Sequence, residues 1–330
     1  MDVPSDPRVR LHVVTGKGGA GKTTVAAAMA LALVARGQRV LLVEVEGRQG
    51  ISQVLDVAPL GATERPLVTD PSGGELLGLA VDAKSALLEY LQKFYKLGRA
   101  GSVLEKVGAV DFATTIAPGV RDVLLIGKVY EAVGRRTKGA RKRPVYDAVV
   151  LDAPPTGRIG RFLAVNSEVS EVARIGPVRT QADSITRLLQ SPAALVHVVT
   201  LLEDMPVQET LDAIDELGDL SLRVGSVIAN GIRPSALTDE QAGAVMAEEP
   251  PTAVLADALA AVDVKAGPAM LQGLLREGAD HVQRARLQEE QRQILDELPV
   301  PVRDLPHLPD GVESGGLRLL ATHLDEQGGL

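Results

Sequence analysis

Residues 14–24 read VTGKGGAGKTT and combine glycines, threonines and two lysines in a spacing suited to phosphate chemistry. The pattern GxxxxGK[ST] is met by Gly16, Gly21, Lys22 and Thr23. In such loops the glycines let backbone N–H groups point at phosphate oxygens, and the lysine reaches the β and γ oxygens. The hydroxyl of Thr23 is expected to bind Mg²⁺. A glycine turn that binds nothing is the alternative, and the pattern favours a site for a nucleoside triphosphate.

The flanking sequence places this loop between a strand and a helix. RLHVVT before it is apolar and rich in β-branched residues, and TTVAAAMALALVARG after it is rich in alanine and leucine and ends at Gly37. The residues expected to surround the phosphates are Gly16, Lys17, Gly18, Gly19, Ala20, Gly21, Lys22, Thr23 and Thr24. One lysine suffices for an ordinary loop of this kind, so the role of Lys17 needs a separate explanation.

Acidic residues lie at the ends of two other strand-like runs. Asp152 ends YDAVVLD and opens DAPPTGR, a turn rich in proline and glycine. A carboxylate there suits a Mg²⁺ site bridged by water, and the turn suits a loop that senses the γ-phosphate. An aspartate that simply ends a strand is the alternative. Glu44 and Glu46 lie at the end of RVLLVEVE, where one of them is expected to orient the attacking water.

Asn230 closes another strand-like run, VGSVIAN. An amide at a strand end can donate to and accept from the edge of a base. A turn residue is the other interpretation of an asparagine at this position. Asn230 is therefore a candidate for contact with the base of a nucleotide.

Strand-like and helical patterns alternate along most of the chain. The strand-like runs are Arg10–Thr15, Arg39–Val45, Leu76–Val81, Tyr146–Asp152, Ala194–Thr200 and Val224–Asn230. Such alternation predicts an α/β fold with a mainly parallel, doubly wound sheet that binds ligands at the carboxyl ends of its strands. We expect one domain over residues 1–330, with a helical subdomain inserted at about 83–143 and 162–190. Further helices are expected near Thr238–Val262, Pro268–Leu295 and Gly315–Leu324.

The composition is that of a globular protein. At 330 residues and 45% hydrophobic side chains, the chain can form a large core. Its 43 acidic and 35 basic side chains give a formal net charge of -8, which argues against general affinity for nucleic acid. The absence of cysteine rules out disulfides and thiolate metal sites in this sequence and fits a cytoplasmic protein. The longest apolar stretch, Val25–Ala35, is shorter than the roughly 20 residues of a membrane span.

Two surface candidates lie in the expected helical subdomain. Leu87, Tyr90, Leu91, Phe94 and Leu97 share one helix face. This face indicates either the core of the subdomain or a groove for an apolar client. The run Arg135–Arg143 carries six basic side chains in nine positions. A solvated loop and a contact with an acidic partner or a membrane surface are both compatible with that run.

The sequence GKGGAGKTT resembles the deviant phosphate loop of the ATPase class that includes ParA, MinD, the nitrogenase iron protein, and the ArsA and tail-anchored-protein targeting ATPases. In that class the early lysine is the signature lysine. The resemblance implies that Lys17 reaches across a dimer interface to the nucleotide of the partner subunit and neutralises charge that develops in the transition state.

The rest of the chain resembles the branch of ArsA and the tail-anchored-protein targeting ATPases, and most closely its actinobacterial anion-transporting members. VEVEGRQG is similar to the first switch of this branch, DAPPTGRIGRFL to the second, GSVIAN to the strand beside the adenine and LPHLPDGV to the loop over the base. The resemblance implies base contacts from Asn230, Pro309 and Asp310. It places the catalytic aspartate of the family on Glu46 and a switch histidine on Gln49.

These similarities imply an ATPase that uses ATP and Mg²⁺ as a dimer switch and moves a helical subdomain that binds a client. The expected partners are a second copy or a paralogous ATPase, together with a hydrophobic protein client or a membrane partner. An energising subunit of an anion exporter and a positioning ATPase of the MinD or ParA kind are the alternatives. Because the chain has no cysteine, arsenite binding through thiolates is excluded.

Overall fold

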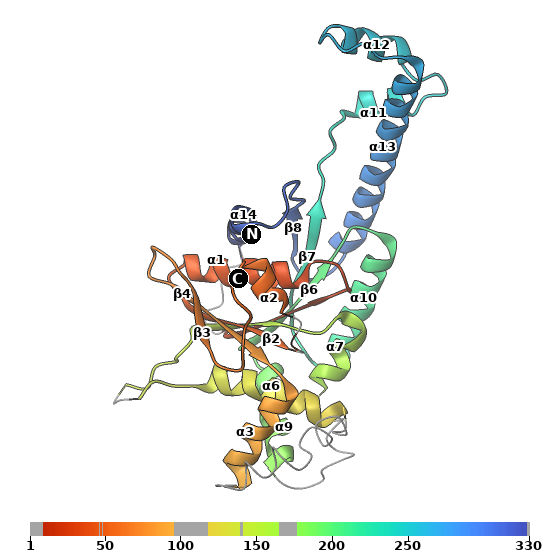
Figure 1. Ribbon diagram of the computed structural model, residues 1–330. Helices are drawn as coiled ribbons and strands as arrows, with labels where there is room; N and C mark the ends of the chain where they lie inside the picture. The colour runs from red at the N-terminus through yellow and green to blue at the C-terminus, as the bar shows by residue number, and fades with distance from the viewer. Residues whose placement is uncertain are drawn as a thin grey trace.

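The computed structural model describes residues 9–45, 47, 49–95, 118–138, 141–164 and 177–328. They form an α/β fold around one eight-stranded sheet of order β3-β4-β2-β5-β1-β6-β7-β8 (Figure 1). The strands are β1 (Leu11–Gly16), β2 (Arg39–Val45), β3 (Arg65–Thr69), β4 (Glu75–Val81), β5 (Ala148–Asp152), β6 (Ala194–Thr200), β7 (Val224–Ile232) and β8 (Val302–Pro306). All pairs are parallel except the antiparallel pair of β3 and β4. The predicted mainly parallel sheet is confirmed.

All six predicted strands are present, and two strands of the sheet were not predicted. β3 is a half-exposed edge strand that contains Pro66, and it pairs with β4 alone. β8 reads VRDLP, in which two adjacent charged residues interrupt the apolar pattern. Since an edge strand needs little apolar surface and can contain proline, both sequences lack the usual strand signal.

Helices cover both faces of the sheet (Figure 1). One face packs against α1 (Lys22–Ala35), α2 (Gly50–Val54) and α14 (Ser314–Glu326). The other packs against α3 (Ala83–Tyr95), α6 (Pro118–Gly134), α7 (Thr156–Leu163), α9 (Pro177–Leu189) and α10 (Asp204–Asp219). The central strands β1 and β5 are mostly apolar, and both of their faces are buried.

The predicted helical subdomain falls partly on residues 96–117, 139–140 and 165–176, which lie outside the described part of the chain. Within the described part, α3, α6 and α9 pack side by side on the sheet. Leu87 of the apolar face proposed for α3 is buried in the core of the sheet. The side chains of the other four residues of that face are not described.

The chain between β7 and β8 forms a long arm that projects from the body (Figure 1). It consists of α11 (Asp239–Val245), α12 (Thr252–Ala260) and α13 (Pro268–Asp296). The helical stretch expected near Thr238–Val262 is present, but it is divided into α11 and α12. Pro250 and Pro251 separate α11 from α12, because proline lacks the N–H that a helix interior needs. Among the helices of the described residues, none combines the length and the apolar character that a bilayer crossing requires.

Candidate nucleotide-binding site

The phosphate loop connects β1 to α1 and owes its shape to glycines. A Cβ atom on Gly16 would lie 2.0 Å from the carbonyl oxygen of Val199, and one on Gly21 would lie 2.3 Å from Nδ2 of Asn230. Gly21 also has a φ of 90°, in the left-handed region that favours glycine. A Cβ on Gly18 or Gly19 would meet no atom within 4 Å, so both face open space.

A hollow of about 300 Å³ lies between this loop and the carboxyl ends of β2 and β5. It is lined by Gly18, Gly19, Gly21, Lys22, Thr23, Thr24, Glu44, Val45, Asp152, Ala153 and Pro154. The first turn of α1 faces the hollow with backbone N–H groups that have no partner within the helix. The positive end of the helix dipole therefore points at the hollow, which suits a phosphate group.

Lys22, Thr23 and Asp152 bring a cation and two oxygen donors together in the hollow. The Nζ atom of Lys22 donates to the carbonyl oxygen of Lys17 at 3.0 Å, and the side chain is buried. Oγ1 of Thr23 donates to Oδ2 of Asp152 at 2.7 Å. Hydroxyl and carboxylate oxygens are the ligands that Mg²⁺ prefers, so the donor set fits the predicted metal site.

Lys17 of the loop forms a side-chain ion pair with α10. Its Nζ atom lies 2.8 Å from Oε1 of Glu209 on α10. Thr156, the first residue of α7, donates its hydroxyl to Oε2 of the same carboxylate at 3.5 Å. Lys17 is not among the residues that line the hollow. Glu209 was missed by the sequence analysis, because nothing marks one acidic residue in the middle of a helix that has several.

Glu44 has a structural role in the turn between β2 and α2. It is buried, and its carboxylate accepts hydrogen bonds from the backbone N–H of Gln49 at 2.5 Å and of Ile51 at 2.9 Å. These bonds hold the left-handed turn at Gln49, whose φ is 58°, and the start of α2. Glu46, the residue predicted to orient the attacking water, lies outside the described residues.

The three residues predicted at the base lie in different surroundings. Nδ2 of Asn230 donates to the carbonyl oxygen of Ala20 at 2.9 Å, so this amide holds the phosphate loop. Pro309 and Asp310 lie in an exposed turn after β8 and are not among the residues that line the hollow. Contact of all three with a base stays a prediction.

A buried polar chain runs beneath the loop, across β1, β6 and β7. Nδ1 of His12 lies 3.1 Å from Nε2 of His197, whose Nδ1 lies 2.8 Å from Oγ of Ser226. Burial, with the nearby guanidinium of Arg303, lowers the pKa of His12 to about 4. Burial likewise lowers the pKa of His197 well below its usual value. Both rings are therefore neutral at pH 7.

The sequence of this chain is similar to those of known ATPases. The family described as anion-transporting ATPase matches residues 9–195. The chain is 51% identical over 321 residues to the ATPase BagA of Mycobacterium tuberculosis, covering 97% of this chain and 94% of that protein. It is 26% identical to an arsenical pump-driving ATPase of Acidiphilium multivorum, covering 92% of this chain and 52% of the other.

A more distant relative lies outside the bacteria. The ATPase ASNA1 homolog of Entamoeba dispar is 24% identical over 260 residues, covering 67% of this chain and 76% of that protein. The family match, the identity to BagA over nearly the whole length and the geometry of the loop agree. The chain belongs to the anion-transporting ATPase family, also called the ArsA family, and is an ATPase.

Proposed function

We propose that this ATPase works as a nucleotide-driven dimer switch that uses Mg²⁺. In the proposed cycle, ATP draws two subunits together at their phosphate loops, and hydrolysis lets them separate. The helices at 83–143 and 162–190 move with this closure and bind a client. The two subunits are two copies of this chain, or one copy and a paralogous ATPase.

The observation that carries the proposal is the different placement of the two loop lysines. Lys22 is buried and lines the hollow, where it can neutralise a phosphate of its own subunit. Lys17 is about one third exposed and is directed away from the hollow, toward α10. A partly exposed cation at the rim of a phosphate site suits a nucleotide on a partner subunit.

The residues of the hollow have different roles in the proposed binding of ATP. The backbone N–H groups at Gly18, Gly19 and Gly21 orient phosphate oxygens, and Lys22 neutralises their charge. Thr23 and Asp152 would hold Mg²⁺, which supplies charge stabilisation for phosphoryl transfer. Glu46 is proposed to orient the attacking water.

A second candidate function is the energising subunit of an anion exporter. It is favoured by the similarity to the arsenical pump-driving ATPase, of which this chain spans about half the length. The anion would have to be held without thiolates, because the chain contains no cysteine. Stimulation of ATP hydrolysis by an oxyanion supports this function, and unchanged turnover over a full titration with arsenite and antimonite argues against it.

Mixing two inactive variants tests whether Lys17 acts on the partner subunit. Lys22→Ala prevents nucleotide binding in its own subunit but keeps Lys17. Lys17→Ala keeps an intact nucleotide site but lacks the signature lysine. Each variant alone is expected to be inactive. A mixed dimer combines an intact pocket with an intact Lys17 from the other chain, so the mixture should recover part of the turnover. A mixture as inactive as its components would refute action across the interface.

A further inference from the structure

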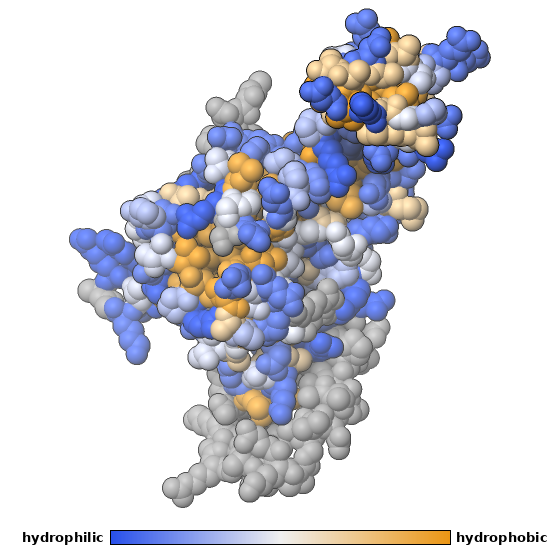
Figure 2. All heavy atoms as spheres, turned by 45° about the horizontal axis from the view of Figure 1, so that its top comes forward, coloured by the Kyte–Doolittle hydropathy of each residue, from blue (hydrophilic) through white to orange (hydrophobic). Residues whose placement is uncertain are grey.

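The end of the arm carries a cluster of exposed apolar side chains. Five of the eight large hydrophobic side chains that are exposed among the described residues lie between residues 246 and 270. They are Met246 (37% exposed), Val254 (67%), Val262 (67%), Val264 (36%) and Met270 (45%), and we call them the tip surface. Figure 2 shows apolar residues gathered at this end of the molecule, with polar residues around them. Scattered apolar residues are ordinary on a protein surface, whereas a cluster indicates an interaction site.

One helix of this surface, α12, carries Val254 and has no buried residue. α12 reads TAVLADALA, with one charged residue in nine, and none of its side chains is buried. A helix that is apolar around most of its circumference normally lies in a protein interior. α12 contacts α13, yet all of its side chains remain at least partly exposed although its composition is that of an interior helix.

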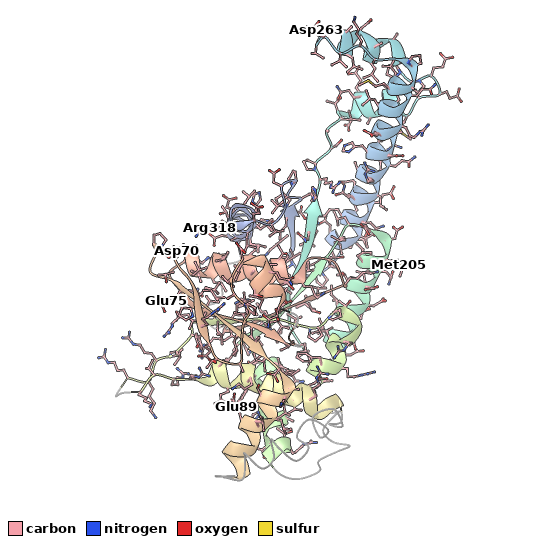
Figure 3. The ribbon with its side chains drawn as sticks, in the orientation of Figure 1. Asp70, Glu75, Glu89, Met205, Asp263 and Arg318 are labelled. Carbon is pink, nitrogen blue, oxygen red and sulfur yellow. The ribbon has the colours of Figure 1, made fainter. Side chains whose placement is uncertain are left out.

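The arm holds this surface far from the nucleotide hollow. α13 has 29 residues, which corresponds to a length of about 44 Å. Its lower end is fixed to the body by a hydrogen bond of 2.7 Å from Nε2 of Gln291 to Oδ1 of Asp204. Figure 3 shows Asp263 at the outer end of the arm, on the opposite side of the molecule from Glu89 of α3. The tip surface is therefore separate from the helices to which the proposed client site was assigned.

The negative charge around the tip surface favours one kind of binding partner over the others. Residues 239–270 contain six acidic side chains and one basic side chain. Two of the acids, Asp257 and Asp263, lie on or directly after α12 itself. A second copy would bring the same negative charge against this one, and an anionic membrane would be repelled as well. A partner with basic residues beside its apolar surface would be attracted.

The shape of the tip fits a large side chain of such a partner. A hollow of about 590 Å³ lies where α12 turns into α13. It is lined by Ala256, Ala260, Asp263, Val264, Lys265, Ala266 and Gly267. Small residues leave room for an anchoring side chain, and apolar helices commonly bind such grooves through anchors spaced along one face.

We propose that the tip surface binds an apolar helix of a partner protein that carries lysine or arginine beside its apolar face. The binding does not depend on the action of Lys17 across a dimer, and the two proposals can fail separately. An occupant at the tip also differs in place from a client of the helices at 83–143 and 162–190.

Fluorescence anisotropy with two matched peptides tests this proposal on the full-length chain. The first is a fluorescein-labelled helical peptide of about 20 residues with a leucine and alanine face and lysines at both ends. The second has glutamate in place of each lysine. We expect the lysine peptide to bind roughly tenfold more tightly, and added salt to reduce the difference. Equal binding of the two peptides would overturn the proposal.

Surface variants locate the site. Val254→Glu combined with Val262→Glu should weaken binding of the lysine peptide roughly tenfold or more, and both positions are exposed enough to keep the fold. Leu319→Glu on α14 is the matched control, because it places the same charge on an exposed apolar residue of the body. Asp257→Lys combined with Asp263→Lys should reverse the preference toward the glutamate peptide. Thermal melts check that each variant is folded.

Three results would contradict the proposal. Unchanged peptide binding by the Val254→Glu, Val262→Glu variant would place the site elsewhere. Self-association of the wild type that this variant abolishes would identify a second copy as the occupant. Flotation of the wild type with phosphatidylglycerol vesicles, again lost in this variant, would identify a membrane.

Discussion

The ammonium of Lys17 and the carboxylate of Glu209 form an ion pair with 2.8 Å between Nζ and Oε1. The pair joins the phosphate loop to α10, and the contact of Glu209 with Thr156 extends the connection to the start of α7. Both side chains are about one third exposed, so the pair contributes only about 0–1 kcal/mol. In the proposed dimer, Lys17 leaves this weak ion pair and contacts the nucleotide of the partner subunit.

Removal of the charge of Glu209 should therefore release Lys17. We expect Glu209→Gln to raise ATP turnover about two- to fivefold, because closure no longer has to break the ion pair. Steady-state release of phosphate measures this. Asp212→Asn on the same helix is the control and should leave turnover unchanged. Lower turnover in Glu209→Gln would show instead that Glu209 positions Lys17 for the reaction.

The fold was largely predictable because its central strands are buried on both faces and therefore read as continuous apolar runs. Pro250 and Pro251 account for the division of the stretch expected to be helical at Thr238–Val262 into α11 and α12. The edge strand β3 and the charged strand β8 lacked that signal.

The structure brings together those predicted site residues that are neighbours in sequence or lie on neighbouring strands. The phosphate loop is contiguous, and the contact of Thr23 with Asp152 follows from the pairing of β1 with β5. The pair of Lys17 and Glu209 depends on the packing of α10 beside α7, which no short pattern encodes. The role of Asn230 at the phosphate loop similarly depends on the order of the strands.

Substitution of the two loop lysines should affect two different properties, nucleotide binding and turnover. Lys22→Ala should abolish nucleotide binding, because it removes the buried cation of the hollow. Lys17→Ala should leave binding largely intact and remove turnover, because Lys17 does not line the hollow. Titration with a fluorescent ATP analogue measures the first property, and phosphate release measures the second. Normal turnover by Lys17→Ala would refute a catalytic role of this lysine.

Asn230→Ala distinguishes support of the loop from recognition of the base. Since the amide of Asn230 bonds to the carbonyl of Ala20, its loss should weaken binding of ATP and GTP equally, by about 1 kcal/mol or roughly fivefold. Competition titrations with the two nucleotides measure the effect. A loss confined to ATP would show that Asn230 reads the adenine edge instead.

The buried histidines predict a pH dependence of stability. The folded protein keeps the pKa of His12 at about 4, whereas in the unfolded chain this histidine has its ordinary pKa of 6.5. Between these values the unfolded state binds more protons, so the free energy of unfolding falls as the pH drops through this window. The contribution of His12 is on the order of 3 kcal/mol, and His197 acts in the same direction.

Urea unfolding at about pH 7.5 and about pH 5 measures this dependence. His12→Gln should be less sensitive to pH than the wild type, whatever its absolute stability. His323→Gln on the exposed side of α14 should keep the sensitivity of the wild type. The same slope in His12→Gln and in the wild type would rule out His12 as the source.

The most direct test of the dimer switch is the mass of the protein in solution, measured by light scattering in Mg-ADP and then in Mg-ATP. The Glu46→Gln variant should be used, because loss of the proposed water-orienting carboxylate traps the ATP state. The account predicts a compact dimer that forms or closes only with ATP. A chain that binds ATP and keeps the same mass and size in both nucleotides would contradict a self-sufficient switch, and would leave a paralogous ATPase as the required partner of Lys17.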